Sequence, residues 1–230
     1  MANYVLYGSP LSPFVRKAEA VLKSTGQDYE IENINIMDMP DWFLEISPAR
    51  RIPVLRDRSI GEEGIPGTIA DSSAICLFLD RKHESGLYGG TAFETGRIAW
   101  LEEYADTELA MNVGMNIFRP ILFPLMAGKE SDLETARKGF NEKLPPRLDY
   151  LESALDGQDF FVGGRLSLAD IAVATQLCNL DLVAGLPDRS RWPGIVKHAE
   201  TMMQHKVFEA SVETGRKMLA NILPEKPDLT

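Results

Sequence analysis

The hydrophobic pattern of this 230-residue chain changes class once, across a glycine-rich segment, HESGLYGGT, at residues 83–91. Before this segment, apolar residues alternate between strand-like and helix-like spacing, and after it only helical spacing is found. Glycine clusters of this kind are typical of connections between structural units. The pattern therefore predicts an α/β domain over residues 1–83, a linker over 84–91 and an all-α helical domain over 92–230.

The first part of the chain carries the signals of one small sheet with helices. A continuous apolar run, Tyr4–Tyr7, predicts a buried strand, and the helical spacing after Pro13 ends before Gly26, where a left-handed residue is expected. The segments together predict the order β-α-β-α-β-β-α. Strands are expected at residues 4–7, 29–35, 53–57 and 67–70, and helices at 13–23, 41–45 and 72–81.

The second part carries apolar residues at helical spacing only. Pro120 and Pro124 are expected to break the helical run before them, because proline lacks the N–H that a helix interior uses. Ser167 stands three residues before Asp170, which is the spacing of a capping box, so a helix is expected to begin there. Helices are expected at residues 95–115, 133–141, 146–155, 168–183 and 193–204.

Charge and composition limit the partners of the chain. A formal net charge of −10 argues against nucleic acid or an anionic membrane as the main partner, although it permits a local basic site for a small acid. No run of about 18 uninterrupted apolar residues and no secretory signal is found, so no membrane span is expected. Cys76 and Cys178 lie in apolar helical patterns and are expected to be buried thiols, which fits a reducing, cytoplasmic location.

Three motifs of the first part place polar groups where elements begin or end. In SPFVRK, Ser12 precedes Pro13, which is a favoured helix start, and its hydroxyl can cap the helix while donating to a ligand. In SPARRIPVL, a cis bond before Pro53 would turn the backbone of Ile52 outward to pair with an extended ligand, although most such bonds are trans. In ADSSAI, a cap and the following helix N-terminus together suit an amino-acid head group.

With the capping segment GGRLSLADI, these motifs make the chain resemble the cytosolic glutathione transferases over residues 3–215. The resemblance implies a thioredoxin-like N-terminal domain, an all-helical C-terminal domain, a homodimer, and detoxification chemistry with glutathione as the co-substrate. No metal is expected. The resemblance also implies that Pro53 is cis.

In serine-type members of this family the functional hydroxyl opens a motif like SPFVRK, which assigns it to Ser12 and not to Ser9. Val15 stands where a second cysteine would be needed, so the disulfide chemistry of related redox proteins is excluded. Tyr7, at the end of the first strand, is the weaker candidate for a tyrosine-type mechanism. The glutathione-binding residues that the resemblance implies are Ser12, Phe14, Arg51, Ile52, Pro53, Asp71 and Ser72.

Each group has an expected role. Arg51 and Ile52 are expected to hold the cysteinyl-glycine part of glutathione, and Asp71 and Ser72 its γ-glutamyl end. The hydroxyl of Ser12 is expected to donate to the sulfur, so that the thiolate, and not the serine, attacks an apolar electrophile. The expected electrophile pocket is lined by Leu11, Tyr104, Met111, Met115, Phe118, Arg119 and Phe123, of which the methionines and phenylalanines are explained equally well as core residues.

Two positions depart from the family pattern. Asp71 stands where most serine-type relatives have glutamate, and Arg50 stands where glycine is often found. The doubled charge of Arg50 and Arg51 favours an acidic ligand, and pairing with surface acids is the alternative. No role is predicted for the loop RSIGEEGIPG, residues 58–67.

Two other functions fit the same motifs. One is a specialised glutathione-dependent dehalogenase, isomerase, peroxidase or ether-cleaving enzyme, which would differ in the helical pocket. The other is a catalytically idle binding module, which retention of Ser12, Pro53, Asp71 and Ser72 argues against. Binding to immobilised glutathione separates the module from the enzymes.

Overall fold

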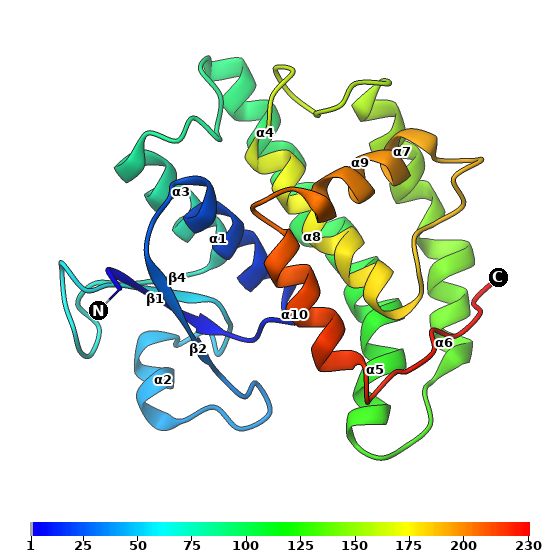
Figure 1. Ribbon diagram of the computed structural model, residues 1–230, viewed down its shortest axis with the longest axis horizontal. Helices are drawn as coiled ribbons and strands as arrows, with labels where there is room; N and C mark the ends of the chain where they lie inside the picture. Colours follow the sequence, from blue (N-terminus) through cyan, green and yellow to red (C-terminus); the bar gives the residue numbers. More distant parts are fainter. Residues whose placement is uncertain (1) are drawn as a thin grey trace. The chain divides into compact units, whose positions relative to one another are not determined.

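The computed structural model describes residues 2–230 and divides into two compact units, which are separated in the sequence between Leu87 and Tyr88. The first unit contains the only strands among these residues, and the second is helical (Figure 1). The predicted fold class, a small α/β domain followed by an all-α domain, is therefore confirmed.

The sheet of the first unit has the strand order β2-β1-β3-β4. β1 runs parallel to β2, with Tyr4 opposite Tyr29, and antiparallel to β3, with Tyr7 opposite Val54. β3 is antiparallel to β4. The strands are β1 (Tyr4–Gly8), β2 (Tyr29–Asn33), β3 (Val54–Asp57) and β4 (Thr68–Ala70).

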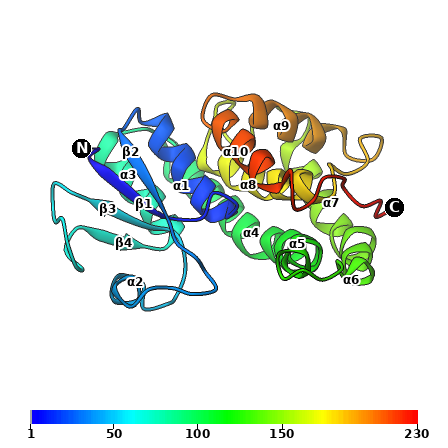
Figure 2. The ribbon, with the colours of Figure 1, turned by 60° about the horizontal axis from the view of Figure 1, so that its bottom comes forward.

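Helices cover both faces of this sheet, as Figure 2 shows. They are α1 (Pro13–Ser24), α2 (Asp41–Ile46) and α3 (Ser72–His83), of which α1 and α3 pack against each other. Val5 and Tyr7 form a core cluster with Phe43 of α2. Tyr4 lies on the opposite face, because side chains alternate along a strand, and its hydroxyl is 2.8 Å from Nε2 of His83 in α3.

The second unit is built around α8 (Leu168–Val183), in which every residue except Asp181 is buried. Its capping box is confirmed, since the N–H of Ser167 donates to Oδ2 of Asp170 at 2.8 Å. The other helices are α4 (Ala92–Tyr104), α5 (Arg119–Met126), α6 (Leu133–Lys138), α7 (Pro145–Leu155), α9 (Pro193–Gln204) and α10 (Glu209–Leu219), with π-helical segments η1 (Ala105–Leu109), η2 (Met111–Phe118) and η3 (Gly139–Lys143).

The predicted break at Pro120 and Pro124 is wrong. Pro120 occupies the first turn of α5, where a missing N–H costs little, and Pro124 lies inside the same helix. The carbonyl that Pro124 leaves without its helical donor is that of Pro120, and it accepts from the N–H of Asp132 at 2.9 Å. The helix continues because a distant donor takes this carbonyl.

The run from α4 to α5, Ala92–Met126, is 35 residues long and, by length and composition alone, is able to cross a membrane. Of the apolar 18-residue stretch that meets these criteria, 39% is buried within the protein. Buried core helices meet the same criteria, and this run packs against α8. The run is therefore weak support for a membrane span.

Candidate functional site

Three chain segments meet at one edge of the sheet in the first unit. β1 ends at Gly8, β3 begins at Val54 opposite Tyr7, and β4 ends at Ala70 opposite Val54. The residues that follow β1, precede β3 and follow β4 therefore share this edge. These are the segments that contain the glutathione-binding residues predicted from the sequence.

Gly8 allows two of these segments to approach each other. A Cβ atom at Gly8 would lie 2.4 Å from Cγ2 of Val15, in the first turn of α1, and 3.5 Å from Cβ of Ile52. The side chain of Val15 is fully buried and branched at Cβ, so it has little freedom to move. A glycine is needed here because the backbone, the helix start and the loop before Pro53 are in close contact.

Ser12 is the N-cap of α1. Its backbone is extended, with φ −76° and ψ 125°, and its Oγ accepts from the N–H of Val15 at 3.4 Å, with Pro13 at the first helical position. Among residues 2–230 the hydroxyl proton of Ser12 is donated to no other group. The side chain is partly exposed and so is able to cap the helix and donate to a ligand at once. Phe14 lies in the same helical turn and is also partly exposed.

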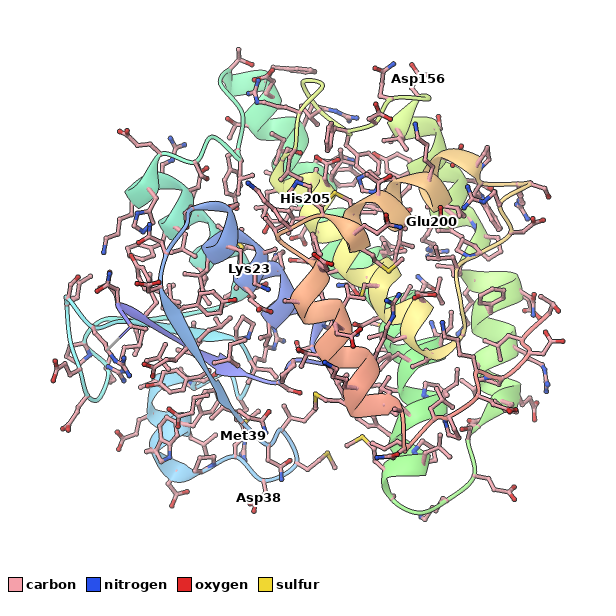
Figure 3. The ribbon with its side chains drawn as sticks, in the orientation of Figure 1. Lys23, Asp38, Met39, Asp156, Glu200 and His205 are labelled. Atoms are coloured by element: carbon pink, nitrogen blue, oxygen red, sulfur yellow. The ribbon has the colours of Figure 1, made fainter. Side chains whose placement is uncertain are left out.

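The Ile52–Pro53 peptide bond is cis, as the resemblance implied. Neither the N–H nor the C=O of Ile52 makes a hydrogen bond within the described part of the chain. The side chain of Ile52 packs, together with that of Met39, against the core cluster around Tyr7. Met39 is labelled in Figure 3 and lies on the loop between β2 and α2. The side chain of Ile52 is thus anchored while its peptide groups remain open to a ligand.

Arg50 and Arg51 are exposed, and neither forms an ion pair with any of residues 2–230. The alternative expectation, that Arg50 and Arg51 pair with surface acids, is therefore not met among these residues. Arg50 adopts a left-handed conformation with φ 55°. The backbone of Arg51 is held by Ser47, a buried serine that sequence reasoning missed, because nothing in its local pattern distinguishes it from an ordinary helix end.

Asp71 is the N-cap of α3. Its Oδ1 accepts from the N–H groups of Ser73 at 2.9 Å and Ala74 at 3.4 Å, and its φ of 83° is unusual for a residue other than glycine. Its Oδ2 accepts no hydrogen bond from the described residues. Ser72 is buried in the first turn, and Lys17 of α1 donates to Oγ of Ser73 at 3.2 Å. The start of α3 is thus fixed next to α1.

The side chain of Tyr7 is held in the core and is not among the groups gathered at this edge. Its ring is buried on the α2 face with Phe43 and Trp42, and its hydroxyl accepts from Nε of Arg56 at 3.1 Å. The same guanidinium donates to three backbone carbonyls of the loop at residues 58–67, at distances of 2.8 to 3.2 Å. Arg56 therefore organises the loop that had no predicted role. The three carbonyls belong to Gly61, Gly64 and Pro66.

The structure divides the predicted electrophile pocket. Leu11 belongs to the first unit, whereas the other six residues belong to the second. Met111 and Met115 are 57% and 44% exposed, and Phe118 is buried as a core residue. Arg119 lies over the ring of Phe123 at 5.3 Å, and the rings of Tyr104 and Tyr150 of α7 pack at a tilt with their centroids 4.6 Å apart. Burial raises the pKa of Tyr104.

Two concavities of the second unit have other linings. The larger, of about 490 Å³, lies beside α7 and is lined in part by Leu148, Arg191 and Trp192. The smaller, of about 240 Å³, lies between α8 and α10. Neither includes a residue of the predicted electrophile pocket. Among residues 2–230, no three or more His, Cys, Asp or Glu side chains are arranged to hold a metal ion.

Comparison with known proteins gives consistent matches over both units. The family models "Glutathione S-transferase, N-terminal domain" and "Glutathione S-transferase, C-terminal domain" match residues 6–87 and 110–206. Glutathione S-transferase 4 of Zea mays is 30% identical over 203 residues, covering 81% of this chain and 84% of that protein.

Solved structures agree with these matches. The crystal structure of a glutathione S-transferase from Rhodospirillum rubrum aligns with a TM-score of 0.80 at 25% identity, covering 90% of this chain and 91% of that one. A glutathione S-transferase-I bound to lactoylglutathione has the same fold, with a TM-score of 0.77 at 23% identity over 94% of this chain and all of that one.

Proposed function

Because the chain belongs to the glutathione S-transferase family, we propose that it conjugates glutathione to electrophilic, mostly apolar small molecules, with Ser12 as the group that activates the thiol. The observation that carries this proposal is the hydroxyl of Ser12. It accepts from the first turn of α1, keeps its proton for a ligand, and lies at the sheet edge shared with Ile52 and Asp71.

The energetics of the proposed step are modest. A free thiol has a pKa of about 8.5, and each unit of depression requires about 1.4 kcal/mol of preference for the thiolate. A hydrogen bond to a charged group is worth about 1.5–3 kcal/mol, and the N-terminus of α1 adds about 0.3–1 kcal/mol. Together they lower the pKa by about one to three units, which leaves a large fraction of bound thiol ionised at neutral pH. The thiol proton passes to water, the sulfur forms the new bond to carbon, and the leaving group departs with its electron pair.

The rest of the proposed site binds the peptide. The open N–H and C=O of Ile52 pair with the cysteinyl residue of glutathione. The free carboxylate oxygen of Asp71 takes the γ-glutamyl ammonium, and Ser72 with the start of α3 takes the adjoining carboxylate. Arg50 and Arg51, which lack acidic partners, suit the glycyl carboxylate. The complex of a structural relative with lactoylglutathione supports this choice of ligand.

We assign the electrophile to the exposed apolar side chains of the α4–α5 run, chiefly Met111 and Met115.

We also propose a cytoplasmic homodimer. Phe93 and Trp100 lie two helical turns apart on α4 and are 78% and 48% exposed. Exposed apolar side chains mark an association surface where they form one contiguous patch. A monomer mass in light scattering would contradict the dimer.

The thiol activation is tested by replacing Ser12 with alanine. At pH 7, Ser12→Ala should lower kcat/KM for a chromogenic electrophile about ten- to a hundredfold and raise the pKa of bound glutathione, read from thiolate absorbance, by about one to two units. Ser9→Ala is the control, because the Oγ of Ser9 also accepts a backbone N–H at 3.4 Å, from Leu11. Full turnover in Ser12→Ala with an unmoved thiol pKa would refute the role of Ser12. A folded wild type that binds no immobilised glutathione would refute the enzymatic proposal itself.

A further inference from the structure

Ser47 is a buried hydroxyl that contacts the loop before the cis proline. It ends α2 and is only 1% exposed, whereas Pro48 to Arg51 are all exposed. Its Oγ donates to the carbonyl of Arg51 at 2.7 Å and accepts from the N–H of Arg51 at 3.1 Å. One hydroxyl therefore holds both backbone groups of one residue.

The backbone of Ser47 is itself fixed. Its N–H donates to the carbonyl of Phe43 in α2 at 2.9 Å, and its carbonyl accepts from the N–H of Arg50 at 2.8 Å. Arg50 closes this turn in its left-handed conformation. The contacts of Ser47 with Arg51 thus connect the loop to the end of a helix, and through Phe43 to the core cluster.

The geometry of a peptide unit extends this contact to Ile52. The carbonyl of Arg51 and the N–H of Ile52 belong to one planar trans unit and point in opposite directions. When the carbonyl is held toward Ser47, the N–H of Ile52 must point away from Ser47. That N–H makes no hydrogen bond within residues 2–230 and is the group assigned above to the cysteinyl residue of glutathione.

We propose that Ser47 is a positioning residue for glutathione: its hydroxyl sets the direction of the N–H of Ile52 before the ligand arrives. The proposal rests on the function proposed above. Without the hydroxyl, no other described side chain bonds to the backbone of Arg51, so no hydrogen bond fixes the orientation of the peptide between Arg51 and Ile52. Binding must then select one orientation, which weakens affinity.

The test compares Ser47→Ala with Ser211→Ala. Ser211 is also a buried serine, 4% exposed, whose hydroxyl donates to a backbone carbonyl at 2.8 Å, but it lies in α10 of the second unit. Calorimetry with glutathione and steady-state kinetics are measured at a temperature where each variant is folded. Ser47→Thr keeps a hydroxyl, and Ser47→Cys replaces it by a weakly bonding thiol of similar size if the alanine variant does not fold.

Ser47→Ala should weaken glutathione binding about three- to tenfold and raise KM for glutathione equally, with kcat at saturating glutathione and KM for the electrophile unchanged. Ser211→Ala should leave glutathione affinity unchanged, and Ser47→Thr should bind more tightly than Ser47→Ala. Unchanged affinity in Ser47→Ala, or an equal loss in Ser211→Ala, would overturn the positioning role while leaving the proposed function standing. Absence of glutathione binding by the wild type would overturn both.

Discussion

The hydroxyl of Tyr7 accepts a hydrogen bond from the guanidinium of Arg56 at 3.1 Å, and both side chains are buried. The two residues belong to adjacent strands, β1 and β3, and point to the face of the sheet that α2 covers. Tyr7 is therefore bound within the core, while Ser12 lies beyond the end of β1 and has a hydroxyl proton free for a ligand. This arrangement favours a serine-type over a tyrosine-type site.

Removing the hydroxyl of Tyr7 should affect stability and not catalysis. Tyr7→Phe deletes the bond from Arg56 and leaves one guanidinium donor without its partner, which should cost about 1–3 kcal/mol in the free energy of unfolding. Urea unfolding measures this loss, and kcat/KM for a glutathione conjugation should stay within about twofold of the wild type. A large loss of kcat/KM in the folded variant would show that Tyr7 takes part in the chemistry.

Arg56 should determine whether the loop at residues 58–67 stays ordered. Arg56→Met leaves three loop carbonyls and the hydroxyl of Tyr7 without a donor, so we expect a loss of about 3 kcal/mol. The loop should also become sensitive to a glutamate-specific protease, which cleaves after Glu62 or Glu63.

Arg58→Met is the matched control. Arg58 is a neighbouring arginine whose side chain is more exposed than that of Arg56, and it forms an ion pair with Glu30 at 3.1 Å. Its loss should be below about 1 kcal/mol, and the loop should resist the protease. Equal losses and equal cleavage in the two variants would contradict the role of Arg56.

Asp57 should make stability depend on pH in the acid range. Its side chain is 2% exposed; burial acts to raise its pKa, but hydrogen bonds from Lys82 and Ser59 outweigh this and hold the pKa below its ordinary value. A depressed carboxyl pKa stabilises the fold above the unfolded-state pKa of about 3.9, and this stability is lost as the pH falls through the folded-state pKa.

The free energy of unfolding of Asp57→Asn should therefore be lower than that of the wild type at pH 7, and the difference should shrink below about pH 4. Urea titrations between pH 7 and pH 2 measure it. Asp159→Asn removes the carboxylate of an exposed ion pair with Lys197 and should follow the wild-type curve closely. A constant difference between wild type and Asp57→Asn across this range would rule out the linkage.

A helix crossing in the second unit depends on Gly139. A Cβ atom there would lie 2.6 Å from the backbone oxygen of Asn116 in η2, and a backbone atom does not move aside cheaply. Gly139→Ala should lower the free energy of unfolding by about 1–3 kcal/mol. Gly96→Ala, inside α4 with nothing within 4 Å, should instead raise it by about 0.5–1 kcal/mol. Thermal unfolding of both variants measures these two changes in stability. A Gly139→Ala variant more stable than the wild type would contradict the close packing.

The sequence predicted the elements of the first unit well, because apolar spacing and helix starts are local signals. The expected helix at residues 13–23 is α1 with one more residue, and its serine cap is present. The second strand begins where predicted but ends two residues earlier, at Asn33 and not at residue 35, because Ile34 is buried without belonging to β2. The helix caps at Ser12 and Asp71 were also predicted from local sequence, and the resemblance implied the cis bond before Pro53.

What the sequence did not predict depends on single hydrogen bonds between a side chain or a helix and a neighbouring loop. The helix passes Pro124 because Asp132 donates to the carbonyl of Pro120. Arg56 is buried within a strand because loop carbonyls up to ten residues away surround its guanidinium. The role of Ser47 requires the fold of a turn that places its hydroxyl against Arg51. None of these contacts leaves a periodic pattern.

The π-helical segments between α4 and α5 also affect which changes in length this chain tolerates. A π turn contains about one residue more than an α turn, so a helix with a π turn accommodates one extra residue without changing direction. Deleting one residue from Met111–Phe118 should convert such a turn to an α turn and keep the downstream side chains facing the same neighbours. The same deletion in α8 would rotate the remainder of a buried helix by about 100°. Natural variation in length is therefore expected to accumulate in the run from α4 to α5 and to be absent from α8.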